Sequence, residues 1–205
     1  MPKLIDYAAR FDLMREAVYE ITLRDGPTAI TLPAVAAHLN TSVSSLRRVL
    51  RSAEELPLLG FQWAERQRRR RLFDHWAEAL RGPEPVLRPV NSLLRGFPRD
   101  RHMAEQDLAW WLLVDAFGPD QAWAREARAD HELALDGSCE AIVGCLGLDE
   151  SEARDRFELL RAVVAGTTSR VFRGLVAPDA GFRVLRCHVV DLLGEAVTLS
   201  DGDAA

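Results

Sequence analysis

The stretch TLPAVAAHLNTSVSSLRRVL, residues 31–50, contains two short apolar stripes separated by a polar turn. Thr31 can cap a first helix, in which Pro33 is tolerated because the first turn does not use its missing N–H. Asn40 and the residue after it predict a tight turn, and Ser42 can cap a second helix that continues to the end of the stretch. Two short helices joined in this way have the proportions of a helix-turn-helix.

Helices are also predicted on both sides of this stretch. An i, i+3, i+4, i+7 stripe that starts at Met14 ends at the helix-stopping sequence Asp25-Gly26-Pro27. Ser52 to Glu55 is typical of a capping box that opens a fourth helix, and Pro57 predicts a kink or a late start there. Further helices are expected over 103–117, 121–146 (as one helix or two), 150–175 and from about 179 to 199, with a proline-rich linker over 82–98.

No segment alternates with the period of two that a half-buried strand requires, so the fold class is predicted to be all-α. The chain has 205 residues, of which 48% are hydrophobic and 28% charged, as in a folded globular protein. No run is long and apolar enough to cross a membrane, and no secretory signal is recognisable, so a cytoplasmic location is expected. The three cysteines lack CxxC spacing, which disfavours a disulfide framework and a structural zinc site.

The charge of the chain is divided unevenly. Residues 1–71 carry 12 Lys and Arg against 8 Asp and Glu, a net charge of +4, while residues 72–205 carry 14 against 23, a net charge of −9. A basic first third indicates a nucleic-acid-binding part attached to an acidic body. The arginine-rich run at 66–71 begins 13 residues beyond Ala53, roughly 20 Å along its helix, and a solvated or acid-paired face is favoured there over direct phosphate contact.

The second helix of the motif is expected to enter the DNA major groove. Nine residues from Ser42 rise about 13 Å, which suits a groove roughly 12 Å wide. Serine can donate or accept a hydrogen bond, valine can meet a thymine methyl, and arginine can fork onto guanine. The hydroxyls at the two helix starts can either bind phosphate or only cap their helices, and both readings stay open. The predicted DNA-binding residues are Thr31, Ser42, Val43, Ser44, Ser45, Arg47, Arg48 and Arg51.

The continuous stretch from Thr31 to Leu56 resembles, position by position, a sequence pattern of the tetracycline-repressor (TetR) family of transcriptional regulators. That family carries a Thr, a Val-Ala pair, and then a pattern like Leu-Gly-Val-Ser-x-Gly-Thr-Leu-Tyr-x-His-Phe-x-Ser-Lys-Glu-Glu-Leu. The resemblance is strong over residues 11–60 and looser elsewhere. Arg47 stands where the family has a phosphate-contacting tyrosine, and Ala53 stands where it has a phosphate-binding lysine. Arg48 and Arg51 supply charge near the same surface.

The resemblance implies an effector pocket among the helices that follow the motif. All five tryptophans fall between residues 63 and 123, which suits a small apolar or aromatic effector, although such rings can equally be plain core. The predicted pocket residues are Trp76, Met103, Trp110, Trp111, Phe117, Trp123, His131 and Cys139.

The last two predicted helices each repeat apolar residues with heptad-like 3,4 spacing. We expect this pair to dock on a second copy as a four-helix bundle; an internal helix pair in a monomer is the alternative. The predicted dimer-interface residues are Phe157, Leu160, Val164, Val171, Phe182, Leu185, Val189 and Leu192.

Together these features predict a DNA-binding domain at 1–54, an effector-binding and dimerisation domain at 55–199, and a disordered tail at 200–205. The expected function is that of a ligand-responsive transcriptional regulator that binds a pseudo-palindromic operator as a homodimer. Repression is expected rather than activation. The alternative is a ligand- or partner-binding dimer of the same fold that has lost operator binding. No catalytic or metal-ligand spacing is present among the five histidines, so neither an enzyme nor a cofactor is expected.

Overall fold

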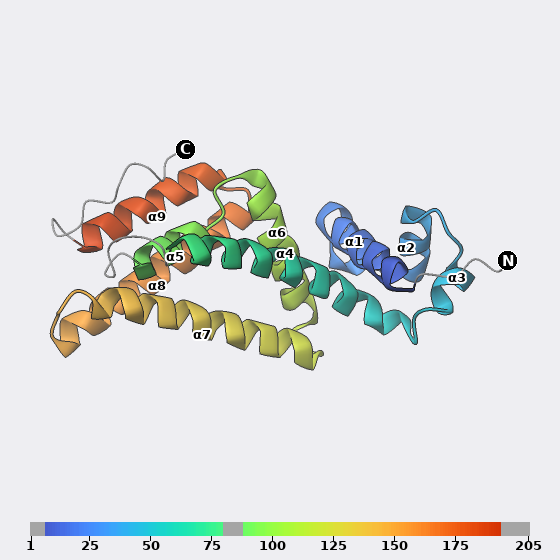
Figure 1. Cartoon of the computed structure of the whole chain (residues 1–205), viewed down its shortest axis with the longest axis horizontal. Coiled ribbons are helices and arrows are strands. Elements are labelled where there is room, and N and C mark those ends of the chain that lie inside the picture. The colour runs from blue at the N-terminus through green and yellow to red at the C-terminus, as the bar shows by residue number, and fades with distance from the viewer. Residues whose placement is uncertain (1–6, 80–87, 194–205) are drawn as a thin grey trace. The chain divides into compact units, whose positions relative to one another are not determined.

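The computed structural model describes residues 7–79 and 88–193, and within these residues it contains helices and no strands (Figure 1), which confirms the all-α prediction. The short helices η1 (Pro27–Ala29) and η2 (Ala53–Glu55) are of the 3-10 type. The α-helices are α1 (Tyr7–Asp25), α2 (Leu32–His38), α3 (Val43–Arg47), α4 (Leu56–Ala79), α5 (Arg88–Gly96), α6 (Arg101–Phe117), α7 (Ala122–Gly144), α8 (Glu150–Phe172) and α9 (Pro178–Leu193).

The chain forms two compact units, described separately here. Unit 1 combines Met1–Arg70 with Glu105–Asp130, and unit 2 combines Arg71–Ala104 with His131–Ala205. The division falls within α4, α6 and α7, so the compact units do not coincide with the functional domains expected from the sequence, which meet at residues 54 and 55. The predicted tail at 200–205 lies outside the described residues.

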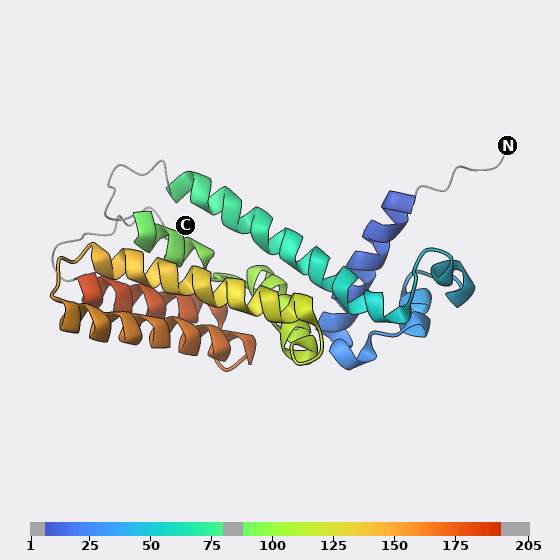
Figure 2. The same ribbon diagram turned by 90° about the horizontal axis from the view of Figure 1, so that it is seen from below.

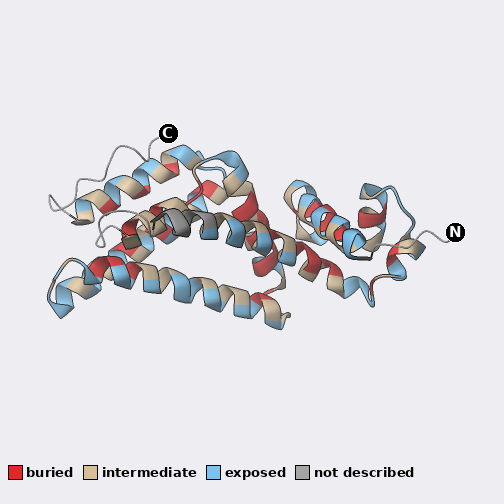
Figure 3. Ribbon diagram, in the orientation of Figure 1, coloured by how far each residue is buried: buried red, intermediate tan, exposed pale blue. Residues whose placement is uncertain are grey.

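The N-terminal part of unit 1 is a small helical head built on the apolar stripe of α1. Met14, Val18 and Ile21 are at most 1% exposed and pack with Val35 of α2 and Leu46 of α3. The start of α4 closes this head core, the cluster that also includes the buried Ala17, Ala36, Leu50, Leu56 and Leu59. In Figure 3 these inward positions are red while the opposite faces of the same helices are pale blue.

The turn between α2 and α3 is fixed by a pair of backbone hydrogen bonds. Asn40 has φ 49°, in the left-handed region that few residues other than glycine and asparagine adopt. The Thr41 N–H donates to the Ala36 carbonyl at 2.9 Å, and the Asn40 N–H donates to the Ala37 carbonyl at 3.1 Å. This is the Schellman pattern of a helix end. The predicted tight turn at Asn40 is confirmed.

Helix α3 is shorter than the sequence predicts. It ends at Arg47, so it has five residues and rises about 7.5 Å rather than about 13 Å. The chain still makes one more helical turn, because Leu50 N–H donates to the Leu46 carbonyl at 3.0 Å. Leu50 is buried in the head core and Ser52 caps the next element, so the backbone must leave the helix path here.

A variant of the predicted capping box connects this segment to α4, with each hydrogen bond going to the N–H one residue before the one that a standard box uses. Ser52 Oγ accepts from the Glu54 N–H at 3.0 Å, and Glu55 Oε2 accepts from the Arg51 N–H at 3.2 Å. The box closes the 3-10 turn η2, and α4 begins only at Leu56. The late start places Pro57 in the first turn of α4, where its missing N–H costs no helical hydrogen bond.

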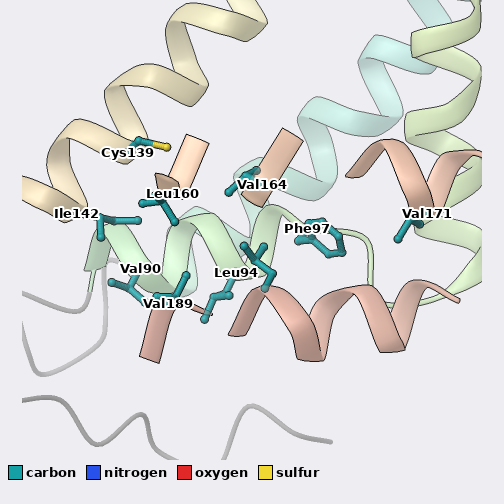
Figure 4. Packing of buried hydrophobic residues seen from close by; sticks show 10 residues of the cluster. Val90, Leu94, Phe97, Cys139, Ile142, Leu160, Val164, Val171 and Val189 are labelled. Atoms are coloured by element: carbon teal, nitrogen blue, oxygen red, sulfur yellow. The ribbon is translucent and has the colours of Figure 1, made fainter. Parts of the chain in front are cut away.

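Unit 2 has a separate core to which α5, α7, α8 and α9 contribute (Figure 4). Helix α5 corrects the sequence analysis, which assigned 82–98 to a linker because of its prolines. Pro89 lies at the second position of α5, where proline is tolerated, while Val90 and Leu94 are buried on one face. Residues 80–87 lie outside the described residues.

Helices α8 and α9 run side by side (Figure 2) and meet closely at Gly181. A Cβ atom placed on Gly181 would lie 2.6 Å from Val171 Cγ2, closer than non-bonded carbons approach, so the glycine permits the contact. Both helices turn their heptad-spaced residues into the core of unit 2.

This burial includes most of the residues of the predicted dimer interface. Five of its eight side chains are at most 7% exposed within a single chain: Leu160, Val164, Val171, Leu185 and Val189. The other three, Phe157, Phe182 and Leu192, are half-buried against the same core. Within a single chain these side chains thus lie in the core or partly against it, so most of the surface that α8 and α9 leave exposed is on their other sides.

No helix in the described part of the chain is long and apolar enough to span a membrane.

Candidate nucleic-acid interface

The predicted DNA-binding residues lie on the helix-turn-helix segment of the head, and two of them cap its helices. Thr31 Oγ1 accepts from the Ala34 N–H at 3.2 Å, and Ser42 Oγ accepts from the Ser45 N–H at 3.2 Å. Each hydroxyl therefore satisfies one of the N–H groups that a helix start leaves without a partner. Both residues are exposed, so capping does not remove them from solvent.

The recognition segment, defined here as residues 42–51, has one inward and one outward face. Val43 packs against the head core beside Leu46 and Leu50, so it is not on the outward face where a thymine methyl would be met. Ser45 is half-buried. The outward, exposed residues of the segment are Ser42, Ser44, Arg47, Arg48 and Arg51.

Three serine hydroxyls form a small hydrogen-bonded cluster at the start of α3. Ser42 Oγ lies 2.9 Å from both Ser44 Oγ and Ser45 Oγ. With its cap bond to the backbone, Ser42 Oγ already has three neighbours within hydrogen-bonding distance. The cluster stiffens the entry to α3 and occupies part of the hydroxyls' hydrogen-bonding capacity.

The guanidinium groups of Arg47, Arg48 and Arg51 form no ion pair among the described residues, although the Arg51 backbone N–H donates to Glu55 Oε2. Six of the other nine arginines of unit 1 are paired with carboxylates: Arg15 with Asp12, Arg24 with Asp25, Arg66 with Asp12, Arg68 and Arg69 with Glu65, and Arg128 with Asp115. Arg10 and Arg70 are exposed without such a partner among the described residues, and Arg125 donates to the Pro119 carbonyl. Three exposed, unneutralised guanidinium groups on one short segment create a local positive surface.

The arginine-rich run at 66–71 has the acid-paired character favoured from the sequence. Arg66 reaches Asp12 of α1 at 3.3 Å, and Arg69 hydrogen-bonds Glu65, which raises the pKa of Arg69. Arg68 lies between Glu65 and the buried Asp107 of α6. Arg70 is exposed and has no acidic partner among the described residues. Arg66 and Arg68 therefore join α4 to α1 and α6 within unit 1, and Arg69 is paired within α4 itself.

Two sets of polar contacts hold the helices that carry the segment. His38, the last residue of α2, places Nε2 at 2.9 Å from Glu20 Oε2 on α1. Asp12 of α1 accepts from Arg15 at 2.7 Å, and this hydrogen bond, aided by Arg66, keeps the pKa of the Asp12 carboxyl below its usual value. The recognition segment is thus attached to a head whose helices are cross-linked by polar contacts as well as by the head core.

Four predicted pocket residues form one aromatic cluster in unit 1. Trp110 is 1% exposed and makes an edge-on contact with Trp111, with ring centroids 5.0 Å apart. Trp123 lies 6.3 Å from Phe117 and 4.7 Å from Phe61, a residue of α4 that the sequence analysis did not select. Phe61 lacks the rarity that drew attention to the tryptophans; its place on the apolar stripe of α4 was the available signal.

Guanidinium groups lie over two faces of this cluster. Arg68 Cζ is 4.8 Å from the Trp110 ring centroid, and Arg128 Cζ is 5.8 Å from that of Trp111. Aromatic faces attract cations through the quadrupole of the ring. The complete burial of Trp110 is that of a core residue, as the plainer reading of the tryptophans expected.

The remaining pocket predictions fall in unit 2. Cys139 is fully buried in the core of that unit, and burial raises the pKa of its thiol to about 11. Met103 and His131 are half-buried. Trp76 lies in the part of α4 whose side chains are not described. Among the described residues, no group of three His, Cys, Asp or Glu side chains could hold a metal ion.

No protein-family model matches the chain, and no curated protein matches its sequence. Two solved structures have the same fold. A transcriptional regulator from Rhodococcus sp. Rha1 is 17% identical, with a TM-score of 0.65 over 89% of this chain and 95% of its own. A candidate transcriptional regulator from Saccharomonospora viridis, in complex with choline, is 14% identical, with a TM-score of 0.68 over 92% of this chain and 97% of its own. The chain therefore has the fold of these helical regulators along nearly its full length.

Proposed function

We propose that the protein is a TetR-type transcriptional regulator that binds duplex DNA through the recognition segment. The observation that carries the proposal is the set of three exposed guanidinium groups, Arg47, Arg48 and Arg51, left without acidic partners beside a capped helix-turn-helix. Lysine and arginine that neutralise backbone phosphates supply most of the affinity of such interfaces. Arginines already paired with carboxylates could do so only by breaking those pairs.

A gel-shift titration with DNA from upstream of the protein's own gene, repeated at several salt concentrations, tests this function. We expect a shifted band, and the logarithm of the binding constant should fall linearly with the logarithm of the salt concentration. Each phosphate contact should contribute about −0.9 to that slope. The double variant Arg47→Ala, Arg48→Ala should lose most of that affinity, whereas the control Arg70→Ala, an exposed arginine outside the segment, should bind as wild type does. Because the double variant removes two charges and the control one, an equal loss of binding free energy per removed charge would assign the effect to net charge and contradict the proposed surface.

We further propose that two copies bind one pseudo-palindromic operator and repress by occupying a promoter. The outward face of α8 and α9 is the surface offered to the second copy. On α8 it carries small residues, Ala162 and Gly166, with the exposed Leu159 beside them; on α9 it carries Val184 and Cys187. Among the described residues, no atom other than the nearby backbone of α8 itself lies within 4 Å of a Cβ built on Gly166, so the described part of the chain leaves this position open. Small residues allow helix backbones of two copies to approach closely.

Light scattering coupled to gel filtration tests the dimer. Gly166→Arg should convert a dimer to a monomer, because a guanidinium group would be buried against its copy without a partner. Gly137→Arg on α7, also an open and exposed helical glycine, is the matched control and should leave the dimer intact. A wild-type monomer, or a dimer that survives Gly166→Arg, would contradict this face as the interface.

A small organic effector is proposed to weaken DNA binding by favouring a different separation of the two heads, a coupling typically of about 1 to 3 kcal/mol. Two observations support it: the aromatic cluster around Trp110 and Trp123, and the choline held by the similar regulator from Saccharomonospora viridis. The probes are choline, tetraethylammonium and the neutral aromatic indole. At 100 times its Kd a ligand should stabilise the fold by about 2.7 kcal/mol in thermal unfolding and release the DNA in gel shifts. No effect of any probe on either readout would count against an effector at this cluster.

The alternative, a dimer of this fold that no longer binds an operator, is favoured by the shortness of α3 and by Arg47 and Ala53 in the TetR tyrosine and lysine positions. Restoring both, with Arg47→Tyr and Ala53→Lys, separates the two functions. Operator binding gained only in this double variant would support the alternative, whereas binding by the wild-type chain would exclude it.

A further inference from the structure

The recognition segment places its arginines in different directions, and this difference assigns them different tasks. The inward side of the segment is fixed by Leu46 and Leu50, which are 5% and 7% exposed in the head core. The Leu50 N–H donates to the Leu46 carbonyl, and Arg48 has φ −78° and ψ −18°, so helical spacing continues through Arg48 although α3 formally ends one residue earlier.

At about 100° per residue, Arg48 is turned roughly 200° from Leu46 and Arg47 only about 100°. Arg48 therefore projects directly away from the head core, on the same side as the exposed Ser44. Arg47 projects from the flank of the segment. A side chain in the centre of the outward face meets base edges when such a segment enters a groove, and one on the flank meets the sugar-phosphate wall.

The chemistry of the outward face distinguishes Arg48 from its neighbour Ser44. The Ser44 hydroxyl is already within 2.9 Å of Ser42 Oγ, and a hydroxyl can pair with any base. The Arg48 guanidinium has no acidic partner among the described residues, and its two parallel N–H groups match the O6 and N7 acceptors that guanine alone presents together in the major groove.

Resting on the proposed DNA-binding function, we infer that Arg48 reads a guanine at a fixed position in each operator half-site, and that Arg47 contacts the backbone without reading sequence. The partner is thus a duplex that has, in each half-site, a G·C pair opposite the centre of the outward face of the recognition segment.

Binding-site selection from random duplexes, followed by affinity measurements on the selected sequence, tests the assignment. The wild-type chain should select half-sites with one invariant G, and replacing that G by A or by 7-deazaguanine, which lacks N7, should weaken binding roughly 5- to 150-fold. Arg48→Ala should select no base at that position and bind both duplexes alike. Arg48→Lys keeps the charge without the fork and should also lose most of the discrimination.

Arg47→Ala should instead weaken binding to every duplex by the same factor and keep the preference for G. It should also reduce the magnitude of the slope of log binding constant against log salt concentration by about 0.9. Circular dichroism should show that these exposed substitutions leave the helix content unchanged. Selected sites without an invariant G, or a G preference that survives Arg48→Ala and is lost in Arg47→Ala, would overturn the assignment while leaving DNA binding in place. Failure of the wild-type chain to retain any duplex would overturn the proposed function itself, and the assignment with it.

Discussion

Substituting Gly60 tests how tightly α4 crosses α1 in the head. A Cβ atom built on Gly60 would lie 2.5 Å from Val18 Cγ1, 3.3 Å from Val18 Cβ and 3.5 Å from Leu113 Cδ1. Carbon atoms make favourable contact at about 3.5 to 4.0 Å, so the added methyl would penetrate Val18 by more than 1 Å. Val18 is fully buried, and valine in a helix has one strongly preferred rotamer, so it cannot turn aside cheaply.

The magnitude is a difference between two opposing effects. Overpacking of this kind costs about 1 to 3 kcal/mol, while glycine to alanine in a helix interior contributes about 1 kcal/mol of stability. At a 2.5 Å approach to a fully buried residue we expect the upper part of the cost, so Gly60→Ala should lower the free energy of unfolding by about 1 to 2 kcal/mol. Gly137→Ala on the open face of α7 causes no overpacking and gains only the better helix propensity of alanine. It should therefore raise the free energy of unfolding by up to about 1 kcal/mol.

Urea unfolding followed by tryptophan fluorescence measures both, since four of the five tryptophans lie in unit 1. The double variant with Val18→Ala removes the clashing methyl groups, so its loss should be smaller than the sum of the two single losses, by at least 1 kcal/mol. A Gly60→Ala chain more stable than wild type, or strict additivity with Val18→Ala at equal m-values, would refute the tight crossing.

Three other predictions concern the turn, the thiols and an ion pair. Asn40→Ala should lower the free energy of unfolding by about 1 kcal/mol in thermal denaturation and Asn40→Gly should not, because only the alanine is strained at φ 49°; equal effects would contradict the left-handed turn. Cys139, buried and with its pKa raised to about 11, should react with a disulfide reagent at pH 8 only on unfolding, while the exposed Cys145 reacts at once. Because Arg15 lowers the pKa of Asp12 from 3.8, the stability that this carboxylate contributes should be present above about pH 4 and lost as the pH falls through its folded pKa. The urea midpoints of wild type and Asp12→Asn should therefore differ at pH 7 and approach one another as the pH falls through the folded pKa of Asp12, and a difference that does not change with pH would show that the pair does not act.

The parts of the head that sequence reasoning predicted are those fixed by local chemistry. A hydroxyl before an apolar stripe caps a helix wherever it occurs, and Thr31 and Ser42 do so. Asparagine tolerates the left-handed conformation, and Asn40 adopts it. The length of α3 was not predictable in this way, because Leu50 continues the apolar spacing of the helix but reaches the head core through a turn.

Helix α5 was missed because proline has two opposite meanings. In a helix interior it removes a hydrogen bond, whereas in the first turn it costs none. Pro89 is in the first turn, and the short apolar pair Val90 and Leu94 that follows is too brief to establish a helical period by itself. What stabilises α5 is contact with α9 in the core of unit 2, and such contacts between distant segments are not written in the local sequence.

The heptad spacing of α8 and α9 shows what periodicity can and cannot decide. It correctly identified which side of each helix is buried, since Leu160, Val164 and Leu185 are at most 7% exposed. Spacing contains no information on whether the covering surface belongs to the same chain or to a copy, because burial against either has the same energetic effect. The cover in unit 2 comes from α5 and α7. A dimer built on α8 and α9 must therefore use their other sides, where Ala162 and Gly166 form a stripe too weakly apolar to be recognised as a seam.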